Sequence, residues 1–136
     1  MSNFKIAIVK ILASEGGYSN DPDDTGGETY RGISRKFWPI WTGWAIIDSA
    51  KKRAGFPANL KSTNILGDAV MNFYRFNFWD AIGGDSIKNQ SISNMLVDSA
   101  VNEGIVPAIK RAQKIVSLPQ TGHVTDELLT KLNTLG

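Results

Sequence analysis

The sequence contains no cysteine and only one histidine, His123. The absence of cysteine excludes a disulfide scaffold, a thiolate metal site and a cysteine nucleophile. A single histidine excludes a multi-histidine metal centre, and a serine–histidine–aspartate triad would have to be built around it. His123 lies near the C-terminus, and we interpret it as a surface residue.

Long apolar segments and a strong charge imbalance are also missing. No stretch approaches the roughly 20 apolar residues that span a bilayer, so stable membrane insertion is not expected. Lys10 interrupts the N-terminal apolar stretch, which falls short of the about 7–15 residues of a secretory signal. The 15 Lys+Arg and 13 Asp+Glu give a net charge of +2, and the basic residues are scattered except at 51–53. We therefore expect no nucleic-acid partner.

The 136 residues accommodate one domain, or two small subdomains that share a core. Apolar residues recur with helical spacing in most of the chain, and no strand longer than five residues is evident, so the predicted class is mainly α. Residues 16–33, with five glycines and four acidic residues, are predicted to form a long structured loop with room for a short hairpin. In the first half of the chain the predicted helices are residues 3–15, a short stretch at 35–38 capped by Ser34, and a second short helix capped by Asp48 and ending at Gly55. In the second half they are residues 64–80, a helix capped by Ser91 or Ser93 that ends before Gly104, a helix from Pro107 to about Ser117, and a helix capped by Thr125.

Glu15 occupies an unusual position at the end of the first predicted helix. It lies roughly 20° around the helix from both Phe4 and Ile8, so a carboxylate continues the apolar stripe. The negative end of the helix dipole and desolvation both raise the pKa of such a carboxyl group. A carboxylic acid that stays protonated near neutral pH can donate a proton to a leaving group. The alternative is a solvated glutamate at a helix end, with no catalytic role.

The loop after Glu15 supplies further carboxylates, Asp21, Asp23, Asp24 and Glu28. Glycosidases use two carboxyl groups, one protonated and one ionised, so one loop carboxylate is a candidate partner for Glu15. For Asp21 and Asp23 we favour a simpler role in turns. The loop also matches part of a calcium-binding pattern, but it lacks the bidentate glutamate at the last position, and we expect no metal site there.

Several motifs occur in order along nearly the whole chain. In the first half they are Glu15-Gly16-Gly17-Tyr18, Asn20-Asp21-Pro22-Asp23-Asp24, Gly26-Gly27-Glu28-Thr29 and Gly32-Ile33; in the second half they are Asn72-Phe73-Tyr74-Arg75, Phe78-Trp79-Asp80, Ile82-Gly83-Gly84-Asp85 and Ala100-Val101-Asn102-Glu103-Gly104. The first set resembles the signature of the glycoside hydrolase family 108 N-acetylmuramidases, lysozyme-like enzymes of bacteria and phages often labelled secretion activator proteins. The second set resembles the peptidoglycan-binding region that accompanies that family.

The resemblance implies a lysozyme-like, mainly α fold with an acidic, glycine-rich active-site loop after the first helix. It also implies a muramidase part at 1–65 and a peptidoglycan-binding-like helical region at 66–136, which we expect to form one compact unit together. The expected reaction is hydrolysis of the β-1,4 bond between N-acetylmuramic acid and N-acetylglucosamine, with no cofactor. By the family pattern Glu15 is the catalytic acid. Asp24 and Thr29 occupy positions similar to those of the second carboxylate and the threonine of phage-type lysozymes, although Thr29 comes one residue early.

The expected substrate-binding residues are drawn from both halves of the chain. Glu28 replaces a small residue of the family pattern and is a second candidate carboxylate beside Asp24. Aromatic side chains are candidates for stacking on sugar rings, and two polar residues follow apolar helical runs that lead toward a cleft. The full set is Tyr18, Glu28, Tyr30, Trp79, Asp80 and Asn102, with Trp41 as a further stacking candidate.

The partners follow from the same resemblance. We expect peptidoglycan glycan strands as the substrate, a monomeric protein, and an export partner, holin-like or other. The chain would be made in the bacterial cytoplasm without a recognisable signal peptide and would act at the cell wall after release. The alternatives are a non-catalytic peptidoglycan-binding module and a secretion-accessory protein.

Overall fold

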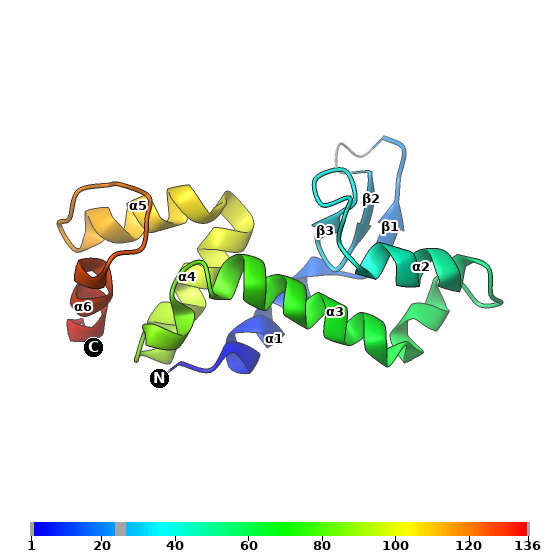
Figure 1. Cartoon of the computed structure of the whole chain (residues 1–136), viewed down its shortest axis with the longest axis horizontal. Coiled ribbons are helices and arrows are strands. Elements are labelled where there is room, and N and C mark those ends of the chain that lie inside the picture. Colours follow the sequence, from blue (N-terminus) through cyan, green and yellow to red (C-terminus); the bar gives the residue numbers. More distant parts are fainter. Residues whose placement is uncertain (1, 24–26, 136) are drawn as a thin grey trace. The chain divides into compact units, whose positions relative to one another are not determined.

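The computed structural model describes residues 2–23 and 27–135, except for the side chains of Ser14 and Glu15. The chain forms two compact units (Figure 1). Unit 2 is the continuous segment Leu12–Phe73, and unit 1 combines Met1–Ile11 with Tyr74–Gly136. This division differs from the predicted regions 1–65 and 66–136, because the first turns of the N-terminal helix pack with the C-terminal half of the chain.

Unit 1 consists of helices (Figure 1). Helix α1 (Phe4–Glu15) begins in it, and the backbone amide of Ser2 donates a hydrogen bond of 2.9 Å to the carbonyl of Ile87. The apolar core of the unit includes Ile8, Leu96, Ile109 and Leu128. The remaining elements are the π-helical turn η2 (Arg75–Trp79), the 3-10 turn η3 (Gly84–Ser86), α4 (Gln90–Glu103), α5 (Ile105–Ile115) and α6 (Asp126–Thr134).

The first helix follows its prediction closely. Phe4, Ile8 and Ile11 are buried on one face, and Lys5 and Lys10 are exposed on the other. The stripe predicted from helical spacing is therefore the buried face of α1, because burial of these side chains drives the packing of an amphipathic helix.

Unit 2 combines a small sheet with helices. Strands β1 (Tyr18–Asn20), β2 (Glu28–Tyr30) and β3 (Ile33–Ser34) form an antiparallel sheet in the order β1-β2-β3. Arg31 and Gly32 both have positive φ, which is the backbone of a tight two-residue hairpin turn. The predicted loop at 16–33 thus contains a hairpin, as anticipated, and a third strand begins at its last residue, Ile33.

The helices of unit 2 are α2 (Gly43–Lys51), the 3-10 turn η1 (Ala58–Ser62) and α3 (Asn64–Tyr74), whose last residue is assigned to unit 1. Trp44, Ile47 and Leu66 are fully buried among them. The ring of Trp41 lies so close to Gly43 that a Cβ there would sit 2.2 Å from it. Only glycine therefore fits at the start of α2.

Several predicted helix boundaries were wrong. Residues 35–37 form a turn instead of the start of the short helix predicted at 35–38, and Asp48 lies inside α2 instead of capping a helix. The cap of α4 is Asn89, whose side chain accepts a hydrogen bond from the amide of Ile92, and neither Ser91 nor Ser93 has this role. The side chain of Asp48 accepts hydrogen bonds from Arg35 instead of from the start of a helix.

Other boundaries were predicted correctly. Thr125 caps α6 by accepting a hydrogen bond of 3.1 Å from the amide of Leu128. Gly104, with φ of +101°, ends α4, and Pro107 lies in the first turn of α5. The predicted helix 64–80 is α3 continued by η2, where the amide of Asp80 donates to the carbonyl of Arg75. This wider π-type turn adds one residue to the helical repeat.

Within the described residues no helix combines the length and the apolar character needed to cross a membrane.

Candidate active site

Glu15 is the last residue of α1, as predicted from the sequence. Gly16 follows with φ of +71°, a conformation that favours glycine and turns the chain out of the helix. Strand β1 begins shortly afterwards at Tyr18, so the Glu15-Gly16-Gly17-Tyr18 motif joins α1 to the sheet. The side chain of Glu15 and the whole of Asp24 lie outside the described part of the chain, and their predicted roles stay predictions.

Glu28 is the best-defined carboxylate of the described loop. It begins β2, and its side chain is only 11% exposed. Its Oε2 atom lies 2.5 Å from Nζ of Lys51 and accepts a hydrogen bond of 2.6 Å from the hydroxyl of Tyr18. Its Oε1 atom accepts a hydrogen bond of 3.0 Å from Nη1 of Arg35.

The cluster extends to Asp48 on α2. Nη1 and Nη2 of Arg35 donate to the two carboxylate oxygens of Asp48 at 2.8 and 2.7 Å, a bidentate arrangement. Nζ of Lys51 lies 3.4 Å from Oδ1 of Asp48. We refer to Tyr18, Glu28, Arg35, Asp48 and Lys51 as the ionic cluster. It ties two strands of the sheet and the turn after β3 to helix α2.

The ionic cluster shifts the pKa values of its members. Burial raises the pKa of Glu28, but hydrogen bonds from Lys51, Tyr18 and Arg35 outweigh it and leave the pKa below its ordinary value. The hydrogen bonds from Arg35 lower the pKa of Asp48 to about 2. Burial and the hydrogen bond to Glu28 raise the pKa of Tyr18. The two carboxylates are therefore ionised, and the phenol keeps its proton, near neutral pH.

This arrangement defines what Glu28 can do. A carboxylate has about four acceptor positions, and three of those of Glu28 are filled by protein groups. With its lowered pKa it holds no proton to donate near neutral pH. Glu28 thus has the surroundings of a structural anchor for β2, and little of its side chain is open to a substrate.

The tyrosines of the sheet line a small cavity in unit 2. Tyr18 pairs with Tyr30 across β1 and β2, and the Tyr18 ring packs edge-on against Phe56, with 4.9 Å between centroids. The cavity has a volume of about 270 Å³ and is mostly apolar. It is lined by Gly17, Tyr18, Tyr30, Arg31, Pro57, Ala58, Leu60 and Lys61. Thr29 precedes Tyr30 on β2, is paired with Ser19 on β1 and is half-buried.

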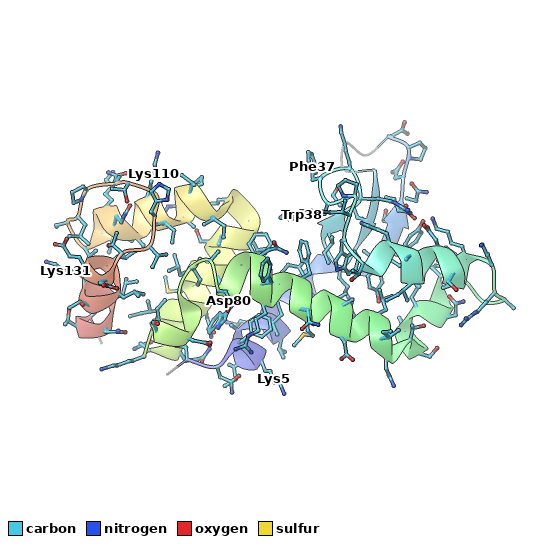
Figure 2. The ribbon with its side chains drawn as sticks, in the orientation of Figure 1. Lys5, Phe37, Trp38, Asp80, Lys110 and Lys131 are labelled. Carbon is cyan, nitrogen blue, oxygen red and sulfur yellow. The ribbon has the colours of Figure 1, made fainter. Side chains whose placement is uncertain are left out.

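The candidates in unit 1 have different environments. Trp79 is fully buried, its ring packs against Phe4, and its Nε1–H donates a hydrogen bond of 2.8 Å to Asp85. The expectation that Trp79 stacks on a sugar is therefore corrected, because neither face of the ring is open. Asp80, labelled in Figure 2, and Asn102 are both exposed.

Sequence reasoning missed Arg35 and Lys51 as site residues. Both are ordinary basic residues in the sequence, and only the pairing of the sheet with α2 brings them to Glu28. Trp41, a further stacking candidate, donates through Nε1 to the carbonyl of Ala69 on α3, and its ring packs edge-on against Trp44 of α2. Within residues 2–23 and 27–135 no group of three or more histidine, aspartate or glutamate side chains is arranged to hold a metal ion.

Comparison with known proteins identifies the class of the fold. The solved structure of Brucella abortus SagA resembles the chain with a TM-score of 0.65 and 26% sequence identity, over 98% of this chain and 70% of that one. The fold is thus mainly α and lysozyme-like. No curated protein sequence matches the chain.

The family model of glycosyl hydrolase 108 matches residues 8–104. The chain therefore belongs to the glycosyl hydrolase 108 family and is a glycoside hydrolase. At the level of the family, the activity is peptidoglycan hydrolysis. The match begins inside α1 and ends at the glycine that closes α4, so it includes the whole candidate loop.

Proposed function

We propose that the chain is an N-acetylmuramidase that cleaves the β-1,4 bond between N-acetylmuramic acid and N-acetylglucosamine. One observation carries this proposal. Glu15 ends α1 and leads directly into the hairpin, within the segment that matches the family model. A glutamate at this junction combines the negative end of a helix with a neighbouring polar loop, the setting that produces two carboxyl groups of different protonation.

The proposed chemistry starts with proton donation from Glu15. The carboxylic acid gives its proton to the glycosidic oxygen while the bond from that oxygen to the anomeric carbon breaks. Asp24, with Thr29, positions a water molecule or stabilises the positive charge that develops on the sugar ring. Because Glu28 is held by Lys51, Tyr18 and Arg35, we assign the second carboxylate role to Asp24 in preference to Glu28.

Substrate binding in this proposal uses the sheet and the second half of the family match. The cavity beside Tyr18 and Tyr30 has one apolar wall from the tyrosines and two cationic residues, Arg31 and Lys61. Such a cavity suits one sugar ring or the acyl group that it carries, since ligand sites combine apolar walls with a few polar groups. The exposed Asp80 and Asn102 are available for hydrogen bonds to glycan strands.

The cellular setting is part of the same proposal. The chain is made in the bacterial cytoplasm and acts on the wall as a monomer after release through a holin-like or other export partner. The alternative is a non-catalytic peptidoglycan-binding or secretion-accessory module, in which Glu15 has only a structural role.

The test is mass spectrometry of the fragments released from purified peptidoglycan. A muramidase yields fragments with reducing-end N-acetylmuramic acid. Anhydro ends would indicate a lytic transglycosylase, and cleaved stem peptides an amidase or peptidase; either result contradicts the proposal. If folded protein binds the wall in a sedimentation assay but releases no fragments, the non-catalytic alternative is correct.

A further inference from the structure

An exposed apolar run, Phe37-Trp38-Pro39-Ile40, connects β3 to α2 in unit 2. The exposed fractions are 68% for Phe37, 37% for Trp38 and 93% for Ile40. Transfer of such side chains out of water is favourable, and soluble proteins seldom leave several consecutive apolar residues exposed without a functional reason. The run therefore has the composition and the exposure of an interaction surface.

The centre of this run is anchored to unit 2. The amide of Trp38 donates a hydrogen bond of 2.8 Å to the carbonyl of Ser34, and its own carbonyl accepts one of 2.9 Å from Nε1 of Trp44. The ring of Trp38 packs edge-on against Phe73 at a centroid distance of 4.8 Å. Figure 2 labels Phe37 and Trp38 on this connection. The anchor fixes the backbone while the neighbouring side chains stay exposed.

The charge next to the run is positive. Of the three basic residues in 29–47, Arg35 is paired with Glu28 and Asp48, and Lys36 is the exposed one. Lys36, directly before the run, is exposed, and its Nζ lies 5.8 Å from the centroid of the Phe37 ring. A positive charge thus accompanies the apolar tip, which favours a partner with an apolar interior and an anionic surface.

We propose that this run binds peripherally to the surface of an anionic phospholipid bilayer, with Phe37 and Ile40 entering the interface and Lys36 facing the headgroups. Aromatic and aliphatic side chains next to lysine are typical of membrane-interface segments. A glycan is the poorer partner, because ligand sites place a few hydrogen-bonding groups among their apolar walls. The side chains of Phe37, Pro39 and Ile40 carry no hydrogen-bonding group. The proposal does not depend on hydrolytic activity.

The experiment is co-sedimentation of the purified full chain with vesicles of phosphatidylglycerol and phosphatidylethanolamine. The test variant is Phe37→Ser with Ile40→Ser. The matched control is Phe76→Ser with Ile65→Ser, which removes the same two residue types at sites that are 76% and 64% exposed. We expect the test variant to lower the partition coefficient between water and vesicles at least about tenfold, because serine lacks the favourable free energy of moving an apolar side chain out of water. The control should leave this coefficient nearly unchanged. Lys36→Gln should weaken binding to these vesicles and reduce its salt dependence, with no effect on vesicles of phosphatidylcholine.

Circular dichroism before each assay confirms that the variants are folded. The proposal is overturned if the unmodified chain does not sediment with vesicles, or if the test and control variants lose binding equally. It is also overturned if Phe37→Ser with Ile40→Ser abolishes sedimentation with purified peptidoglycan while vesicle binding is unchanged, which would identify a glycan surface. A dimer that this variant dissociates, without vesicle binding, would identify a second copy of the chain as the partner.

Discussion

Lys51 on α2 and Glu28 on β2 form the closest ion pair of the ionic cluster, with Nζ 2.5 Å from Oε2. The same carboxylate accepts hydrogen bonds from the hydroxyl of Tyr18 and from the guanidinium of Arg35. Three residues from separate segments therefore hold one carboxylate at the start of the strand that carries Thr29. The geometry of the loop after Glu15 depends on this contact between the sheet and a helix.

Glu15→Gln should abolish wall hydrolysis while leaving the protein folded. Glutamine keeps the size of the side chain but has no proton to transfer, and general acid catalysis contributes about 10²–10⁴-fold to a rate. Release of reducing ends from purified peptidoglycan measures the loss. Glu127→Gln on the exposed first turn of α6 is the matched control and should keep full activity. Equal activity of Glu15→Gln and the control would show that Glu15 is not the catalytic acid.

Glu28→Gln should destabilise unit 2 by about 1–3 kcal/mol at neutral pH, because charged hydrogen-bond partners lose a largely buried acceptor. Urea unfolding measures this change. If Glu28 anchors the hairpin, activity of the variant at low temperature should remain well above that of Glu15→Gln. Complete inactivity of a stably folded Glu28→Gln protein would instead give Glu28 a direct catalytic role.

The ionic cluster should make stability sensitive to acid. The pKa of Asp48 falls to about 2 in the folded chain, and that of Glu28 is also lowered. Lowered folded pKa values mean that this stabilisation is fully present above the ordinary carboxyl pKa of about 4 and disappears as the pH falls through the folded values. Because the side chain of Asp48 is 42% exposed, its share is small and weakens with salt.

Urea unfolding between pH 5 and pH 2 tests this dependence. The free energy of unfolding should fall more steeply for the unmodified chain than for a variant with both Glu28→Gln and Asp48→Asn. Asp126→Asn, on the exposed first turn of α6, serves as the control. Parallel curves for the double variant and the unmodified chain would mean that the cluster does not determine acid stability.

Trp79→Ala should reduce stability strongly, by about 3–5 kcal/mol, because it empties a fully buried site. Trp79→Phe should cost less, since it keeps most of the packing and loses mainly the hydrogen bond to Asp85. Thermal unfolding with both variants measures the effect. A sugar-stacking role predicts a different result, in which stability is retained and only KM rises.

Asn89→Ala should destabilise the chain by about 1 kcal/mol, because the side chain of Asn89 satisfies the amide of Ile92 at the start of α4. Ser91→Ala, two residues along the helix at an exposed site, should change stability by less than about 0.5 kcal/mol. Urea unfolding of the two variants side by side makes the comparison. A larger loss for Ser91→Ala would restore the cap predicted from the sequence.

Features that depend on residues close together in the sequence were predictable from it. The buried face of α1 follows from the spacing of Phe4, Ile8 and Ile11, and the start of α6 follows from Thr125. The start of α4 could not be predicted in this way, because asparagine and serine both cap helices well and three candidate caps, Asn89, Ser91 and Ser93, lie within five residues. The wider turn of η2 was not predictable either, since helical spacing alone does not distinguish it from an α-helix.

The sequence by itself determined the mainly helical class, the place of Glu15 at the end of the first helix and the family to which the motifs belong, because helical periodicity, capping residues and long ordered motifs are local properties of the chain. Only the tertiary structure decided that Glu28 is held by Lys51 and Arg35, that Trp79 is core and that Phe37 and Ile40 are exposed. Ion pairing and burial depend on which distant segments pack together. An aromatic residue or a carboxylate has the same appearance in the sequence whether it is open to a ligand or buried among protein groups.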